Sequence, residues 1–247
     1  MVLLTHAELD WLRAAYPKLV PNDHNTEIRG EITFRAAYDV ASAVFSIARP
    51  HAAEPPGLIL SGTYDILIKD VATMEKVRWL FPRLYIQDDA FPCCAERHFY
   101  VGKGACLCGP SEEAALLKQG YFFQQYLEEL CIPFLYGQRY YDIHAQWPWP
   151  QYDHDTLGAL ESYLARGNLE SIQFTLWWSL NAYATWPWMR AILSSKKRPK
   201  GHMPCFCEKG APIRNCHPEA WEGLKKLYAD VRASGVELPS VDQGGGA

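Results

Sequence analysis

The sequence lacks any uninterrupted apolar run that approaches the ~18–20 residues needed for a membrane-spanning helix. It also lacks a strong excess of one charge, since 28 acidic and 24 basic side chains give a net charge of −4. Broad binding to nucleic acid or to anionic membranes is therefore not its expected role. The first residues show no basic segment, apolar core or small-residue cleavage site of a secretory signal. These absences predict a soluble, cytoplasmic protein with no membrane contact and no direct nucleic-acid partner.

The composition that is present is globular and rich in aromatic residues. Hydrophobic residues make up 49% of the 247 residues and charged residues 21%, which excludes wholesale disorder. The chain has 9 Trp, 14 Tyr and 10 Phe, and much of the Trp lies between positions 147 and 188. The length suits one domain with an appendage, or two small domains.

The N-terminal region predicts one helix followed by strands. Thr5 and Glu8 have the spacing of a capping box, and the helix that they begin ends before Pro17. Alternating apolar and polar residues then predict strands over 28–35 and 58–69, and a third strand over 83–87. Residues 49–57 predict a loop, and 71–80 a short helix or an irregular insert.

Helical spacing returns in the second half of the chain. It predicts helices over 121–135 and 156–166, a further helix starting after Asn168, and a last helix over 218–234. The stretch 88–112 between the strands and these helices has no regular pattern. Long irregular segments in compact domains often carry function.

Eight cysteines fall in groups that suit metal ligands or reactive thiols better than disulfides in a reducing compartment. The strongest group is Cys205-x-Cys207, followed after eight residues by Cys216-His217. Three thiolates and an imidazole are a usual ligand set for structural zinc, which takes four ligands in a tetrahedron. Metal binding would supply folding energy that so short a loop lacks. His202 is a weaker substitute for His217.

This ligand arrangement resembles the SEC-C motif, a small zinc element often found at the C-termini of bacterial proteins. All four ligand positions match the motif. Its usual Gly-Ser-Gly centre is replaced here by Glu-Lys-Gly at 208–210. The sequence therefore predicts a zinc element near the end of the chain.

The irregular stretch contains a second candidate site, centred on Cys106. A thiol nucleophile must be accessible and at least partly ionised. His98 and Lys103 are the nearest side chains that would favour ionisation. Small residues beside the cysteine would let an extended peptide approach the sulfur: Gly102, Gly104 and Ala105.

The order of elements, a capped helix, an antiparallel meander, a loop with Gly-x-Cys-Leu and then helices, resembles the ubiquitin-conjugating enzyme fold. More specifically, it resembles the bacterial conjugating-enzyme-like proteins of antiphage operons. The supporting stretches are 19–35 (LVPNDHNTEIRGEITFR), 61–70 (SGTYDILIKD), 104–110 (GACLCGP) and 132–137 (IPFLYG). Together with the SEC-C-like end, the chain is similar to proteins of the short form of type II cyclic-oligonucleotide-based antiphage signalling systems (type II-short CBASS).

The resemblance implies acyl transfer. Cys106 would take the C-terminal carboxylate of a cGAS-like nucleotidyltransferase as a thioester and pass it to an amine of a target. Conjugating enzymes carry an Asn in a His-Pro-Asn motif eight residues before the cysteine. In this sequence His98 holds that position, so His98 or backbone N–H groups would stabilise the oxyanion.

Two other functions are compatible with the same residues. The first is a non-catalytic, zinc-containing adaptor that binds the nucleotidyltransferase. The second is a deconjugating cysteine hydrolase, in which His144 or His154 would act as the base for Cys106.

The remaining cysteines have simpler interpretations. Cys108 is a competing nucleophile beside Cys106. Cys131 lies on an apolar helical stripe and is expected in the core. Cys93 and Cys94 are interpreted as packed thiols.

The predicted fold class is α+β. A ubiquitin-conjugating-like antiparallel sheet of four strands or slightly fewer is flanked by helices, and a helical extension and the zinc element follow. The expected boundaries are a catalytic domain at 1–145, a Trp-rich helical extension at 146–195, the zinc element with the terminal helix at 196–235, and a flexible tail at 236–247.

Overall fold

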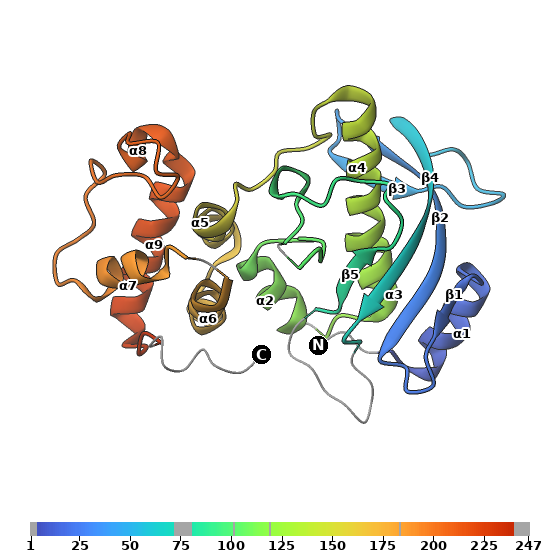
Figure 1. The fold of residues 1–247 in the computed structure, drawn as a ribbon, viewed down its shortest axis with the longest axis horizontal. Coiled ribbons are helices and arrows are strands. Elements are labelled where there is room, and N and C mark those ends of the chain that lie inside the picture. Colours follow the sequence, from blue (N-terminus) through green and yellow to red (C-terminus); the bar gives the residue numbers. More distant parts are fainter. Residues whose placement is uncertain (1–3, 72–80, 101, 119, 183, 240–247) are drawn as a thin grey trace. The chain divides into compact units, whose positions relative to one another are not determined.

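The computed structural model shows an α+β chain that forms two compact units (Figure 1). The described residues are 4–71, 81–100, 102–118, 120–182 and 184–239. The first unit comprises Met1–Leu107 with Leu117–Gln151, and the second comprises Cys108–Leu116 with Tyr152–Ala247. In the described part of the chain no helix is long and apolar enough to span a membrane.

The first unit is built on a five-stranded antiparallel sheet. Its strands are β1 (Leu19–Pro21), β2 (Glu27–Asp39), β3 (Val44–Ile47), β4 (Leu58–Lys69) and β5 (Arg83–Ile86). The order is β1-β2-β4-β5, and β3 also pairs with β2. Because β4 pairs with β2 from residue 27 to residue 38, β1 and β3 share the opposite edge of β2.

The long strands follow the predicted alternation. Ile28 on β2 and Ile66 and Ile68 on β4 are fully buried, which confirms the predicted inward face. Gly30 is required in β2, because its φ is +134° and an added Cβ would lie 2.0 Å from the carbonyl oxygen of Lys18. The expectation of four strands or fewer is wrong. The strands β1 and β3 have three and four residues, too few to show an alternating pattern.

The predicted first helix is α1 (His6–Ala15), and its start is only partly as expected. The Thr5 hydroxyl accepts a hydrogen bond from the Glu8 N–H over 3.2 Å. The Glu8 carboxylate accepts one from the Gln124 N–H over 3.0 Å, at the beginning of a later helix, instead of completing the capping box. The side chain of Glu8 therefore joins two helices that are distant in sequence.

That later helix runs through α3 (Phe123–Gln125), a π-helical segment η2 (Tyr126–Cys131) and α4 (Ile132–His144). Pro133 has no N–H to donate to residue 129, and the wider π-turn precedes this interruption. The sequence located the start of the helix but placed its end at 135 instead of His144. The Tyr136 hydroxyl donates to the Leu58 carbonyl over 2.7 Å and fixes α4 against the sheet.

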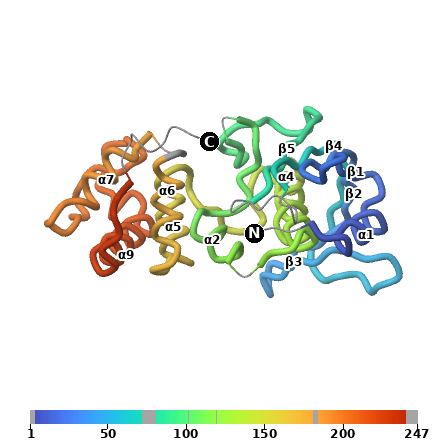
Figure 2. The backbone as a smooth tube through the Cα atoms, turned by 90° about the horizontal axis from the view of Figure 1, so that it is seen from below, coloured from blue at the N-terminus to red at the C-terminus, as the bar shows by residue number. Residues whose placement is uncertain are grey.

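The second unit is helical (Figure 2). It contains most of α2 (Pro110–Lys118), with α5 (Asp155–Arg166), α6 (Ile172–Ala182), α7 (Trp186–Ser194), α8 (Ile213–Cys216) and α9 (Pro218–Ser234). The predictions of α5 and α9 are confirmed, whereas α7 and α8 were not expected. Helices α5 and α9 pack closely, since a Cβ on Gly223 would lie 2.0 Å from the Leu160 carbonyl oxygen.

One hydrophobic core joins the Trp-rich helices to the segment that carries the predicted metal ligands. It contains Trp186 and Met189 from α7 together with Cys205 and Phe206. Val236, in the stretch expected to be a tail, packs against this core. The predicted insert over 71–80 lies outside the described residues except for residue 71, and so does the tail from residue 240 onward.

Candidate functional site

The structure pairs the two predicted residues of the thiol site in the first unit. The Cys106 N–H donates to the His98 carbonyl over 2.8 Å, and Phe99 and Ala105 form an antiparallel bridge between them. The Ala105 N–H donates to the Leu84 carbonyl over 2.8 Å and attaches this pairing to β5. His98 has a left-handed backbone with φ 55°, which turns the chain into the pairing.

Arg97 fixes this loop to α4. Its Nε donates to the Gln138 side-chain oxygen over 2.7 Å, and the Gln138 amide donates back to the Arg97 carbonyl over 2.7 Å. Its guanidinium also donates to Asp142 over 2.6 Å and lies 4.7 Å from the centre of the Tyr141 ring. Arg97 is only 7% exposed. Sequence reasoning missed this residue, because a single Arg in an irregular loop carries no signal of burial.

Cys106 and His98 line one cavity of about 800 Å³ in the first unit. The other lining residues come from the end of β2, from β3 and its flanking residues, from the position after Cys106, from the π-helical turn and α4, and from the segment after α4. They are Tyr38, Ala43, Phe45, Ser46, Ile47, Arg49, Leu107, Glu128, Glu129, Leu130, Pro133, Phe134, Gly137, Trp147, Trp149 and Gln151. Such a volume lies within the ~300–1,000 Å³ typical of ligand pockets.

The two tryptophans form an aromatic wall of this cavity. The ring of Trp147 meets that of His98 edge to face, with 5.1 Å between centroids. An added Cβ on Gly137 would lie 3.2 Å from Trp147 and 3.6 Å from Trp149, so the glycine makes room for both rings on α4. The ring of Trp149 also meets that of Tyr38, 5.0 Å away. The Trp-rich segment thus contributes to the thiol site, which the sequence alone did not predict.

The other candidate residues of the thiol site lie elsewhere. Cys108 and Lys103 are not among the lining residues of the cavity. His144 lies exposed in the last turn of α4, with its ring 4.3 Å from that of Tyr140, and does not line the cavity either. His154 precedes α5 in the second unit.

The eight cysteines form no disulfide. Cys131 is fully buried, and burial raises the pKa of its thiol, so the prediction of a core cysteine is confirmed. Cys93 is exposed and Cys94 half-buried, so the interpretation of packed thiols is wrong for Cys93.

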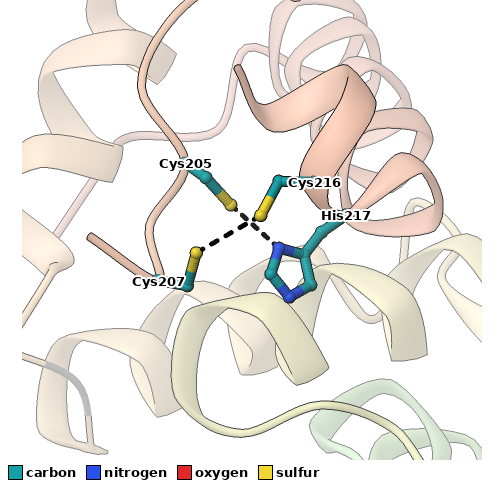
Figure 3. A group of neighbouring side chains, drawn as sticks. All are labelled: Cys205, Cys207, Cys216 and His217. Atoms are coloured by element: carbon teal, nitrogen blue, oxygen red, sulfur yellow. Dashed lines mark hydrogen bonds between the residues drawn. The ribbon is translucent and has the colours of Figure 1, made fainter. Parts of the chain in front are cut away.

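The predicted metal ligands come together in the second unit (Figure 3). One ligand atom from each of Cys205, Cys207, Cys216 and His217 lies within 4.8 Å of all the others. The sulfurs of Cys207 and Cys216 are 3.5 Å apart, and the Cys205 sulfur is 3.0 Å from His217 Nδ1. Two sulfurs bound to one tetrahedral zinc lie about 3.8 Å apart. The group can therefore hold one metal ion, whereas the alternative ligand His202 is exposed and outside it.

The backbone between the ligands folds back in a short turn. The Cys205 N–H donates to the Ala211 carbonyl over 3.0 Å, and Pro204 pairs with Pro212. Glu208 and Gly210 have φ values of 59° and 78°, which the reversal of the chain requires. Cys216 ends α8 and His217 is the N-cap of α9, so the second pair of ligands is held by helix ends.

Asp153 orients the histidine ligand. Its carboxylate accepts from His217 Nε2 over 2.7 Å, which leaves Nδ1 directed toward Cys205. Asp153 is itself held, because its N–H donates to Glu161 over 2.7 Å and its carboxylate accepts from the His154 N–H over 2.7 Å. Sequence reasoning missed Asp153, since nothing in its local pattern links it to ligands so much later in the chain.

The three thiols differ in acidity. Burial raises the pKa of Cys205 to about 12, and the hydrogen bond with Cys207 raises the pKa of Cys216. At Cys207 burial acts to raise the pKa, but hydrogen bonds from the Lys209 N–H and the neighbouring thiols outweigh it, so the pKa is lowered. A divalent ion that binds all three thiols must displace the protons that Cys205 and Cys216 hold most tightly.

No protein-family model, curated protein or solved structure matches this chain. The chemistry of the molecule is therefore read from its two sites. The first unit offers a thiol and an imidazole in one cavity, which suits nucleophilic catalysis. The second offers four ligands with the separations of a closed metal centre.

Proposed function

We propose that this chain is a cysteine-dependent acyltransferase in which Cys106 carries an acyl group as a thioester. One observation carries the proposal: Cys106 and His98 line the same cavity, while the neighbouring Cys108 does not. A cavity of about 800 Å³ with aromatic walls accommodates more than a small thiol reagent. The fully buried Cys131 offers no such access.

The reaction begins with an activated carboxyl group, either an acyl adenylate or a thioester held by another protein. The Cys106 thiolate attacks the carbonyl carbon, a new C–S bond forms, and the bond to the adenylate oxygen or to the donor sulfur breaks. An amine of the acceptor then attacks the thioester. A C–N bond forms, the C–S bond breaks, and the amine proton passes to a base, for which His98 is the imidazole in the cavity.

The order of elements supports a ubiquitin-conjugating-like fold for the first unit. A capped helix, an antiparallel sheet, the loop with Cys106 and, after α2, a long helix come in the chain order that the sequence resemblance implies. The same resemblance supports a role in antiphage defence (type II-short CBASS). In that role the acyl donor is the C-terminal tail of a cGAS-like nucleotidyltransferase.

We also propose that the ion of the second unit is zinc. Three thiolates with one imidazole are the ligands that zinc prefers in structural sites, and four protein ligands leave no position for a substrate. The carboxylate of Asp153 on the ligand histidine is the outer partner that such sites commonly have. The role of the ion is to hold the ligand loop and α9 in place.

The test is intact mass spectrometry, without reductant, of the chain co-expressed with a cGAS-like nucleotidyltransferase from the same operon. We expect a covalent adduct of the two chains that hydroxylamine removes and Cys106→Ala abolishes. Cys108→Ala is the matched control and should leave the adduct in place. If the adduct depends on Cys108 instead, the assignment of the nucleophile is wrong. A stable complex with no adduct, even when the tail of the nucleotidyltransferase is supplied as an activated thioester, would reject the enzyme in favour of an adaptor.

A further inference from the structure

Strand β3 presents an open edge to the first unit's cavity. Its four residues pair with β2 on one side, and no described strand pairs with its other side. The Ala48 N–H donates to the Arg35 carbonyl over 2.8 Å, which shows which residues of β3 direct their backbone groups toward β2. Since inward and outward backbone groups alternate in an antiparallel pair, the N–H and C=O of Phe45 and Ile47 point away from β2.

The cavity follows this edge along the strand. Phe45, Ser46 and Ile47 all line it, although successive side chains of a strand point to opposite faces. A cavity that touches three successive residues must touch the backbone as well as the side chains of one face. The same cavity is lined by Cys106, so the open edge and the thiol belong to one continuous space.

The edge is short, but it lacks two of the usual protections against strand addition. Its four residues, Val-Phe-Ser-Ile, include neither a charge nor a proline. Phe45 is fixed from behind by Tyr136 of α4, with 5.3 Å between ring centroids, so the strand is held on a rigid element. Figure 1 shows β3 next to α4, as this contact requires.

We propose that the open edge of β3 binds the C-terminal segment of the acyl donor as an added β-strand and directs its last carbonyl toward Cys106. The inference rests on the proposed function for the chemistry at Cys106. Hydrogen bonds to the backbone groups of Phe45 and Ile47 supply the affinity, and they require an extended peptide. The rings of Tyr38 and Trp149, 5.0 Å apart, offer a wall for one apolar side chain of that segment.

Binding is measured separately from catalysis. The protein is the full chain with Cys106→Ser, so that no thioester can form. The probe is a fluorescein-labelled peptide acid, Val-Thr-Val-Thr-Gly-Gly, compared with the same peptide N-methylated at both Val-Thr amides. N-methylation removes strand hydrogen bonds and keeps the side chains. We expect the methylated peptide to bind roughly tenfold more weakly, the effect of losing two hydrogen bonds.

Two substitutions at one position locate the contact. Ile47→Pro removes the outward N–H, which an edge strand tolerates, whereas Ile47→Ala loses the side chain and keeps the N–H. We expect Ile47→Pro to weaken binding of the unmethylated peptide by roughly threefold to tenfold, because one peptide carbonyl loses its N–H donor, and Ile47→Ala to retain the difference between the two peptides. Far-ultraviolet circular dichroism and the melting temperature check that both variants fold.

Equal affinity of the two peptides for the chain with intact Ile47, or no binding of either, would overturn the proposal. These outcomes do not depend on whether Cys106 is a nucleophile, which the adduct experiment tests. If no adduct forms but the unmethylated peptide still binds more tightly, the acyltransferase is rejected and the binding edge is kept. If the adduct forms but the two peptides bind equally, the acyltransferase is kept and the binding edge is rejected.

Discussion

In the first unit the fully buried side chains come from sheet strands and the helices that pack on them, whereas in the second they come from helices and the metal-ligand loop. Ile66, Ile68 and Leu135 typify the first, and Cys205 and Ile213 the second. Among the described residues, a group that can hold a metal ion occurs in the second unit alone. The comparison shows two routes to a stable interior. One is an extensive sheet and helix interface, and the other is a smaller core completed by ligands.

The largest expected difference between the units follows from metal removal. A strong chelator, or Cys205→Ser, should release the ligand loop and α9, because structural zinc supplies on the order of 10 kcal/mol in small domains. Hydrogen exchange measured by mass spectrometry should show protection in α9 falling by roughly 100-fold or more. Protection in β2 and β4 should stay unchanged. His202→Ala, at an exposed histidine outside the ligand group, is the matched control.

Equal loss of protection in both units would contradict this independence. Unchanged protection of α9 after complete metal removal, checked by elemental analysis, would show that the helical core of the second unit suffices. Only the first of these results would indicate that the two units form a single cooperative fold.

A smaller effect is expected when the Arg97 network is broken. Arg97→Leu leaves Gln138 and Asp142 without the buried guanidinium, and should destabilise the first unit by about 3 kcal/mol. The control is Arg13→Leu, since Arg13 pairs with Asp10 in a fully solvated pair and should change stability by less than about 0.5 kcal/mol. Urea unfolding measures both.

The same variant tests how the thiol loop is held. Because Arg97 attaches the chain beside His98 to α4, Arg97→Leu should also raise hydrogen exchange at the Cys106 N–H. If Arg97→Leu lowers the free energy of unfolding no more than Arg13→Leu does, and leaves exchange at the Cys106 N–H unchanged, then β5 alone fixes the loop.

The smallest differences come from two helix glycines, one in each unit. Gly223→Ala places a Cβ 2.0 Å from the backbone oxygen of Leu160, so α5 and α9 must separate at a cost of about 2 kcal/mol. Gly137→Ala meets side chains alone, the Trp147 ring at 3.2 Å and the Trp149 ring at 3.6 Å, and the better helix propensity of Ala offsets this strain to within about 1 kcal/mol. Melting temperatures of the two variants compare them. Equal shifts in melting temperature would show that a Cβ facing a backbone atom costs no more than a Cβ facing a side chain.

The sequence predicted the features that depend on local pattern. The alternation in β2 and β4, the start of α1 and the limits of α5 and α9 are confirmed, because period and capping residues act over a few positions. It missed β1 and β3, which are too short to show a period. It was also wrong about the second hydrogen bond of the Thr5–Glu8 capping box, because the Glu8 carboxylate accepts from the Gln124 N–H of a distant helix instead.

The group that can hold a metal ion shows how much the sequence alone predicts. Its four ligands lie within thirteen residues, so their spacing was sufficient to predict that they meet. Asp153, which orients His217, comes from another part of the second unit, and only the packing of that unit shows its role.

By itself the sequence determined the longer helices and strands and the four candidate metal ligands, because both depend on residues close together in the chain. The tertiary structure alone decided the cavity at Cys106 and the packing of two tryptophan rings against Gly137. It also decided the burial of Arg97 and the open edge of β3. They depend on which segments meet across a sheet and a helix. That choice is made by burial of the whole first unit and not by any local pattern.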